Sequence, residues 1–324
     1  MKRRALICGI SGQDGCYLAK SLLQRDYEVW GSSRNAELNA FANLRHVGIF
    51  DLVQLVSLDL GNQGGLQLLL EHIRPQEIFL LAGQSSVGRS FDSPAETMDS
   101  IAMATLNLLE VIRRVDLGIR FYAAGSTECY GDTGEVPANE ASPFRPCSPY
   151  AVAKASSYWL ISSYRRAYGM FACTGILSNH ESPLRPLHFV TRKIIRSVAL
   201  LMTGREQRLL LGNMNVERDW GWAPEYVDAF AAMLRRESPE DYIIATGESH
   251  TLFEFVDVAF RFANKHWQDF VTVDEQLMRP TDIRRIRVDP SKAATQLGWR
   301  AQFAMKEVIA RLLEDEVAYL SENI

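Results

Sequence analysis

The first half of the chain alternates short apolar runs with longer amphipathic stretches. Apolar runs at residues 5–10, 28–32, 54–58, 77–82, 120–124 and 171–177 have the length of buried strands. Between them, apolar positions at helical spacing predict helices at 17–24, 65–73, 98–115 and 148–168. Such alternation is typical of a parallel sheet with helices on both faces, so we predict an α/β, Rossmann-type doubly wound sheet.

After residue 178 prolines interrupt this rhythm and the elements become shorter. Helices are predicted at 190–203, 225–235, 251–264 and 305–317, and the segments between them leave open a return to the sheet. We therefore expect a first domain at 1–178 and, at 179–324, a smaller C-terminal α/β lobe that carries the substrate. Ligands of open α/β sheets bind beyond the carboxyl ends of the strands, which predicts a cleft between the two parts.

Composition narrows the class of protein. The chain has 324 residues, 47% hydrophobic and 23% charged, which suits an ordinary globular protein with a sizeable core. The net charge of −4 argues against nucleic acid or an anionic membrane as a partner. No apolar run reaches transmembrane length, and the stretch at 5–10 is too short for a signal peptide, so we expect a cytoplasmic protein. The five cysteines lack metal-ligand spacing, so they are expected to be reduced and no metal site is predicted.

A glycine motif follows the first predicted strand directly. Gly9, Gly12 and Gly15 are spaced so that the chain can turn sharply, approach a pyrophosphate and pack a helix closely on the strand. At the start of a strand–helix–strand unit this pattern indicates a dinucleotide site.

The end of the second strand indicates which dinucleotide is bound. An acidic residue usually contacts the ribose there when the cofactor is NAD, but this chain has Arg34 after two serines. A guanidinium can pair with the 2′-phosphate of NADP, which we therefore predict as the cofactor. Asp59 and Leu60, at the end of the third strand, are expected to border the adenine.

The fifth strand and the helix after it supply candidate catalytic residues. Ser126 and Glu128 follow the strand, and Tyr150 lies four residues before Lys154. That spacing places the last two on one helix face. A nearby ammonium is expected to lower the pKa of the Tyr150 phenol toward neutrality, which suits proton transfer.

With these motifs the sequence resembles the extended short-chain dehydrogenase/reductases and, more narrowly, the GDP-mannose 4,6-dehydratase family. The resemblance runs nearly end to end. Its most specific segments are Asn-His-Glu-Ser-Pro at 179–183, Phe-Val-Thr-Arg-Lys at 189–193 and Arg-Asp-Trp-Gly at 218–221.

The resemblance implies an NADP-dependent hydro-lyase that acts on a GDP-sugar. It implies that Tyr150 takes the proton from the hydroxyl on sugar carbon 4, that Ser126 hydrogen-bonds that oxygen, and that Lys154 holds the nicotinamide ribose. Glu128 would remove the proton on carbon 5 and promote loss of the carbon 6 hydroxyl as water. The remaining implied cofactor contacts are Gln13, Asp14, His180 and Arg185. The implied substrate contacts are Ser85, Asn179, Thr191, Lys193, Gly212, Arg218, Arg279 and Asp282.

Several positions depart from the family pattern. The loop after Arg34 is short, and Leu184 stands where relatives carry the first of two arginines, so we expect a homodimer and leave a homotetramer open. Gly125, Cys129 and Asp282 also differ from the usual residues, which leaves a GDP-manno-heptose 4,6-dehydratase as an alternative. A nucleotide-sugar epimerase or reductase and a non-catalytic NADP-binding protein also stay open at this point.

Overall fold

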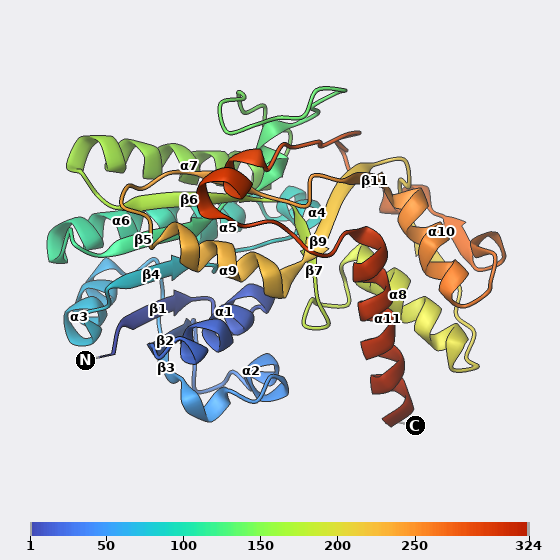
Figure 1. The fold of residues 1–324 in the computed structure, drawn as a ribbon, viewed down its shortest axis with the longest axis horizontal. Helices are drawn as coiled ribbons and strands as arrows, with labels where there is room; N and C mark the ends of the chain where they lie inside the picture. Colours follow the sequence, from blue (N-terminus) through green and yellow to red (C-terminus); the bar gives the residue numbers. More distant parts are fainter. Residues whose placement is uncertain (1, 323–324) are drawn as a thin grey trace.

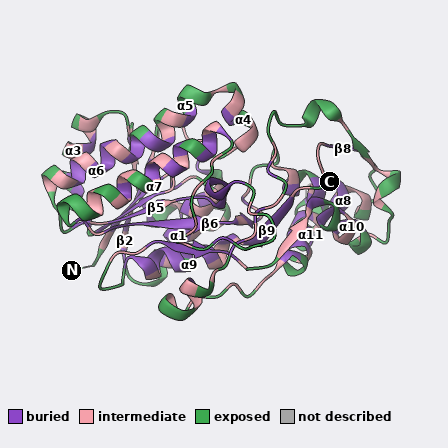
Figure 2. Cartoon of the chain, turned by 90° about the horizontal axis from the view of Figure 1, so that it is seen from above, coloured by how far each residue is buried: buried purple, intermediate pink, exposed green. Residues whose placement is uncertain are grey.

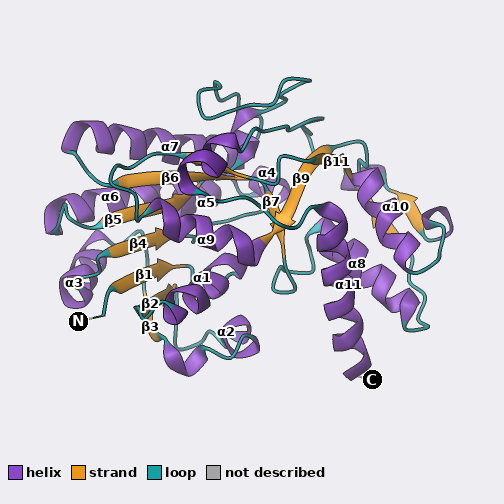
Figure 3. Ribbon diagram, in the orientation of Figure 1, coloured by secondary structure: helices purple, strands orange, loops and turns teal. Residues whose placement is uncertain are grey.

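The central element of this computed structural model, which describes residues 2–322, is a seven-stranded sheet whose paired strands are all parallel. The strand order is β10-β6-β5-β4-β1-β2-β3. The six predicted strands are present (Figures 1 and 3). The bounds are β1 (Arg4–Cys8), β2 (Glu28–Ser33), β3 (Gln54–Ser57), β4 (Glu77–Leu80), β5 (Arg120–Ala124), β6 (Ala172–Leu177) and β10 (Tyr242–Ile244).

Alternating side chains of the sheet enter two separate cores. Ala5 and Ile7 of β1 pack in one core with α1 (Gln13–Gln24) and α9 (Ala223–Met233). Leu6 and Cys8 point the other way, into a core with three helices, α3 (Gln63–Ile73), α6 (Ala104–Val115) and α7 (Pro149–Tyr168). The buried sheet therefore lies between two layers of helices, as predicted (Figure 2).

Several predicted helices have different bounds; the last, for example, ends at Glu322 rather than at residue 317. The first begins at Gln13 rather than at residue 17, directly after the glycine turn. The predicted helix at 98–115 is divided into α5 (Pro94–Met98), a π-helical turn at Asp99–Met103 and α6. The hydroxyls of Thr105 and Ser157 donate to the carbonyl of Ile101 at 2.7 and 3.2 Å, which satisfies backbone in the widened turn. Two short helices, α2 (Ala42–His46) and α4 (Val87–Asp92), were not predicted.

The second half supplies both the lobe and part of the sheet, since β10 and α9 return to the central layers. In the lobe, β7 (Asn179–Glu181), β9 (Glu217–Trp222) and β11 (Ser249–Thr251) form one sheet, and β8 (Leu209–Leu211) pairs with β12 (Val271–Val273). They pack with α8 (Val190–Met202), α10 (Leu252–Phe262) and α11 (Met305–Glu322). Glu316 of α11 pairs with Arg192, at 2.6 Å, and with Arg196 of α8. Among residues 2–322 no helix has the length and apolar character needed to span a bilayer.

Candidate active site

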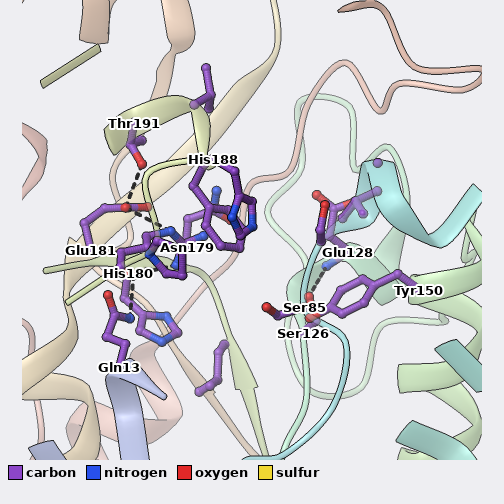
Figure 4. A pocket seen from close by; sticks show the side chains of 18 of the residues that line it. Gln13, Ser85, Ser126, Glu128, Tyr150, Asn179, His180, Glu181, His188 and Thr191 are labelled. Carbon is purple, nitrogen blue, oxygen red and sulfur yellow. Dashed lines mark hydrogen bonds and ion pairs between the residues drawn. The ribbon is translucent and has the colours of Figure 1, made fainter. Parts of the chain in front are cut away.

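A cavity of about 630 Å³ lies where the carboxyl ends of β1, β4, β5 and β6 meet the lobe, and both halves of the chain line it. Its size is within the range of small-molecule sites. Figure 4 shows two groups of side chains: Ser85, Ser126, Glu128 and Tyr150 in one, and Gln13, Asn179, His180, Glu181, His188 and Thr191 in the other. The described residues hold no group of three or more His, Cys, Asp or Glu side chains placed to bind a metal ion.

The glycine motif forms a tight turn at the edge of this cavity. Gly9 has φ +94°, and a Cβ there would lie 2.7 Å from the backbone nitrogen of Ala82. A Cβ at Gly15 would lie 2.3 Å from the carbonyl oxygen of Gly9, so only glycine allows α1 to pack this closely. Gly12 caps α1 without a side-chain hydrogen bond, which leaves first-turn N–H groups for a ligand. These features fit the pyrophosphate of a dinucleotide.

Asp14 and His180 join α1 to the lobe at the base of the cavity. Their Oδ2 and Nε2 atoms lie 3.0 Å apart, and the other ring nitrogen of His180 lies 2.7 Å from the carbonyl oxygen of Ser178. Burial lowers the pKa of His180, but the Asp14 carboxylate and the carbonyl of Ser178 together outweigh it, and the net pKa is raised. Burial raises the pKa of Asp14, and His180, Gln13 and Arg185 together reverse this to a net lowering. The pair is therefore ionised over a wider range of pH than either group would be alone.

Glu181 is a buried residue that the sequence analysis did not assign to the site. The Thr191 hydroxyl donates to its Oε2 at 2.7 Å, and Arg185 Nε lies 3.1 Å from the same oxygen. Arg185 also donates to the carbonyl of His180 at 3.0 Å. Thr191 and Arg185 line the cavity, but each uses side-chain donors in contacts within the protein. Glu181 belongs to the Asn-His-Glu-Ser-Pro segment, but that segment did not indicate this role, because the contact with Thr191 depends on a helix that begins nine residues later.

The four predicted catalytic residues lie together at the carboxyl end of β5. The hydroxyl of Ser126 accepts from the Glu128 backbone N–H at 3.2 Å, which caps a 3₁₀ turn at Thr127–Tyr130. Tyr150 is in the first turn of α7, and its side chain lies beside Ser126 (Figure 4). Lys154, one turn later, donates from Nζ to the carbonyl of Ala124 at 2.6 Å. The strand end and the helix start therefore hold the group in a fixed arrangement.

The expected lowering of the Tyr150 pKa is wrong in this structure. Burial raises the pKa of Tyr150, with Ser126 opposing it only in part. Lys154 does not offset the burial, since its Nζ lies 5.8 Å from the ring centre and bonds to Ala124 instead. Burial also lowers the pKa of Lys154 to about 8.

Glu128 is paired with Arg218 of β9. Arg218 Nε donates to Glu128 Oε1 at 3.2 Å, and the two residues are only 5% and 7% exposed. Arg218 Nη1 donates to the carbonyls of Glu217 and Ile283, both at 2.9 Å. Its Nη2 lies 3.9 Å from Asp282 Oδ1. The predicted base and a predicted diphosphate ligand are therefore in direct contact.

The remaining predicted residues divide into two sets. Ser85, Asn179, Lys193, Gly212, Arg279 and Asp282 line the cavity. Arg34, Asp59 and Leu60 lie after β2 and β3 outside its lining, with Arg34 and Asp59 exposed. Asn43 and His188 also line it and were not predicted, because neither belongs to a motif.

Two residues that depart from the family pattern, Gly125 and Cys129, pack against neighbouring elements. A Cβ at Gly125 would lie 2.6 Å from the Thr174 methyl on the neighbouring strand β6. Cys129 is buried, and its thiol donates to the carbonyl of Ala151 on α7 at 3.6 Å. Both positions therefore pack against the scaffold, and Gly125 also lines the cavity.

The sheet order, the glycine turn and the Ser–Tyr–Lys group define an enzyme of the extended short-chain dehydrogenase/reductase type. Among solved structures, the chain is similar to UDP-glucose 4-epimerase of Thermus thermophilus in complex with NAD, with a TM-score of 0.82 and 27% identity over 97% of this chain and 99% of that one. It is also similar to the dTDP-glucose 4,6-dehydratase DesIV of Streptomyces venezuelae, with a TM-score of 0.84 and 25% identity over 99% and 97% of the two chains.

Sequence comparison identifies the family within this class. The family model for GDP-mannose 4,6 dehydratase matches residues 6–312. GDP-mannose 4,6 dehydratase 1 of Arabidopsis thaliana is 40% identical over 98% of this chain and 90% of its own length. The enzyme named GDP-mannose 4,6-dehydratase from Vibrio cholerae is 39% identical over 98% and 94%. The chain belongs to the GDP-mannose 4,6-dehydratase family.

Proposed function

We propose that the protein is an NADP-dependent GDP-mannose 4,6-dehydratase, which converts GDP-D-mannose to GDP-4-keto-6-deoxy-D-mannose and water. The observation that carries the proposal is the buried carboxylate of Glu128 beside Ser126 and Tyr150 on one wall of the cavity. An epimerase or a simple reductase of this class needs the serine and the tyrosine but no acid/base at this point. The curated relatives at about 40% identity support the same assignment.

The cofactor site fits NADP. Gly9, Gly12 and Gly15 allow the close approach that a pyrophosphate needs, and α1 offers N–H groups to it. We assign recognition of the 2′-phosphate to Arg34, which is exposed after β2 and therefore accessible to a ligand at the sheet edge. When bound, the cofactor supplies a hydride acceptor for sugar carbon 4 and later a donor for carbon 6. Residues 1–178 with α9 and β10 would hold it, while the rest of 179–324 would bind the nucleotide sugar.

The side chains divide the proton transfers between them. Tyr150 takes the proton of the carbon 4 hydroxyl as that carbon is oxidised, and Ser126 hydrogen-bonds the oxygen as it becomes a ketone. The ketone acidifies the proton on carbon 5, which Glu128 would remove and pass to the departing carbon 6 hydroxyl, so that water leaves. When hydride returns to carbon 6, carbon 5 would take up the proton that Tyr150 had removed, which restores both side chains. Lys154 keeps a positive charge close to Tyr150 and the nicotinamide ribose.

Positive charge at the mouth of the cavity suits the diphosphate of the substrate. Lys193 and Arg279 line the cavity and are exposed, so they can reach a phosphate without losing an internal partner of comparable strength. Ser85, Asn179, Gly212 and Asp282 complete the substrate surface in this proposal.

We further propose a homodimer formed through α6 and α7. Val152 and Trp159 lie seven residues apart on α7, and they are 42% and 55% exposed. Met103, just before α6, is 46% exposed. Burial of these apolar side chains against a second copy of the chain would stabilise a dimer, and the contact would brace the helix that bears Tyr150.

The five cysteines are free, which is consistent with the reducing cytoplasm that we assign to the enzyme.

The experiment that tests the function is an incubation of the pure protein with GDP-mannose, GDP-manno-heptose and matched dTDP-, UDP- and CDP-sugars. Mass spectrometry should find that GDP-mannose loses one molecule of water. The reaction should cause no net oxidation or reduction of the cofactor. Water loss from the heptose alone would move the assignment to that substrate. A change in stereochemistry without water loss would contradict the dehydratase assignment.

A further inference from the structure

Glu181 contacts two side chains that the family resemblance assigns to different ligands. Its Oε2 accepts a hydrogen bond from the Thr191 hydroxyl at 2.7 Å (Figure 4) and lies 3.1 Å from Arg185 Nε. The resemblance implies that Thr191 contacts the substrate and Arg185 the cofactor, and both residues line the cavity. We propose that Glu181 couples the two sites, so that the cofactor and the GDP-sugar each strengthen the binding of the other. This proposal rests on the proposed function, in which one cavity holds NADP and the GDP-sugar together.

The carboxylate of Glu181 depends on these two neighbours because it has few other contacts. The residue is fully buried at the end of β7, and its other oxygen, Oε1, has no hydrogen-bond partner among the described residues. Both contacts therefore fall on one oxygen. Since a buried carboxylate is costly without partners, a movement of either neighbour changes how well Oε2 can hold the other.

Arg185 connects Glu181 to the cofactor side of the cavity. Its Nη1 donates to the carbonyl of His180 at 3.0 Å, and Gln13 of α1 donates to the same oxygen at 3.2 Å. Its contact with Glu181 is an ion pair in which Nε is not aligned for a hydrogen bond. A guanidinium has five N–H donors, so Arg185 keeps donors for a cofactor phosphate while it makes these contacts. A cofactor that orders Arg185 therefore also fixes the position of Glu181.

Thr191 connects Glu181 to the substrate side. It lies in the first turn of α8, and its neighbours Val190 and Lys193 also line the cavity. Because its hydroxyl donates to Glu181, the position of Oε2 fixes the direction of that hydroxyl and leaves its lone pairs for a ligand donor. The ligand that binds first therefore bears the cost of ordering these groups, and the second binds to groups that are already placed.

The test measures how strongly NADPH is retained with and without GDP, a ligand that does not turn over. Enzyme loaded with NADPH is diluted, and the fluorescence of the bound nicotinamide gives the dissociation constant. We expect GDP to lower this constant by about fivefold or more in the wild type, the lower end of typical coupling between two sites. Glu181→Gln keeps the size and loses the charge that attracts Arg185, so GDP should then change the constant by less than about twofold. A purely structural role would weaken NADPH binding equally with and without GDP, and would leave the ratio of the two constants unchanged.

Variants on α8 and α11 show where the coupling arises. Thr191→Val removes the donor to Glu181 and should abolish the coupling, whereas Thr191→Ser keeps a hydroxyl and should retain it. Glu316→Gln is the matched control, because Glu316 is also a buried carboxylate paired with an arginine of α8, Arg192, at 2.6 Å, and it lies outside the cavity lining. This control should leave the ratio of the two constants unchanged.

A wild-type protein in which GDP does not alter the retention of NADPH would overturn the proposal. So would a wild-type ratio in Glu181→Gln or in Thr191→Val, and the second variant decides the question if the first does not fold. The titration needs no turnover, so it decides the coupling even with a protein that does not dehydrate GDP-mannose. Absence of turnover in a wild type that shows the coupling would instead refute the proposed function.

Discussion

Replacing Glu128 with glutamine should separate oxidation from elimination. The amide has nearly the size of the carboxylate, so it fits a site where Glu128 is 7% exposed. Its oxygen can still accept from Arg218 Nε, which lies 3.2 Å from Oε1 in the native pair. The substitution therefore preserves the shape of the site and removes the ability to take the carbon 5 proton.

The magnitude follows from that single loss. Removing a positioned general base typically costs about 100- to 10,000-fold in rate. At about 1.4 kcal/mol for each factor of ten, this is roughly 3–5 kcal/mol in the barrier to elimination. The hydride transfer from carbon 4 depends on Ser126 and Tyr150, which lie beside Glu128 but do not need its charge, so that step should remain within about tenfold of wild type.

Rapid-mixing absorbance of the nicotinamide and mass spectrometry of the products measure the two steps separately. We expect bound NADPH to accumulate without deoxy-ketosugar. Glu135→Gln is the matched control, because Glu135 is 75% exposed, pairs with Arg285 and Arg287, and lies outside the cavity lining. It should dehydrate normally. Near-native water loss by Glu128→Gln would refute the reasoning, and so would loss of both steps in a folded protein.

Three further outcomes are expected. Arg34→Ala should weaken NADP binding by about 1.5–3 kcal/mol and NAD binding far less in equilibrium titrations; equal losses would rule out Arg34 as the selector. His180→Gln should destabilise the protein most between pH 3.8 and 6.5, which are the usual pKa values of an aspartate and a histidine. The raised pKa of His180 stabilises the fold fully below pH 6.5, and the lowered pKa of Asp14 stabilises it fully above pH 3.8, so both contributions are present only between these values. The difference from wild type in urea unfolding should shrink above and below that window, and a flat difference would contradict the ion pair. Trp159→Glu should convert a dilution-resistant dimer to monomer in sedimentation, whereas an unchanged dimer would exclude the exposed face of α7; any tetramer of the wild type should weaken as salt is raised.

The strands and most helices could be predicted because their apolar periodicity is local. The exceptions had non-local causes. β10 has three residues and is defined only by pairing with β6, far earlier in the chain. The π-helical turn at Asp99–Met103 depends partly on a hydroxyl of Ser157 on another helix. Gln13 begins α1 because the glycine turn ends there, and the polar start of that helix concealed its first turn.

The proximity of the candidate catalytic residues could also be predicted, since Ser126, Tyr150 and Lys154 occupy a recognisable pattern and line the same cavity. The sequence pattern does not show how deeply each side chain is buried or which residues contact it. Burial raises the pKa of Tyr150, and the sequence spacing of Tyr150 and Lys154 indicated the opposite. The contact between Glu128 and Arg218 joins residues ninety positions apart and needs the lobe to fold over the sheet.

The central claim is an internal hydride cycle, and isotope tracing tests it most directly. The enzyme would be given an equal mixture of two substrates. One is GDP-mannose with deuterium at carbon 4, and the other is GDP-mannose without deuterium but with a heavy-carbon label elsewhere. We predict that the deuterium is found on carbon 6 of the 4-keto-6-deoxy product, in the same molecules that carried it at carbon 4, with no net change in the NADP. Deuterium found in free NADPH, or a product that keeps its carbon 6 hydroxyl, would contradict the account.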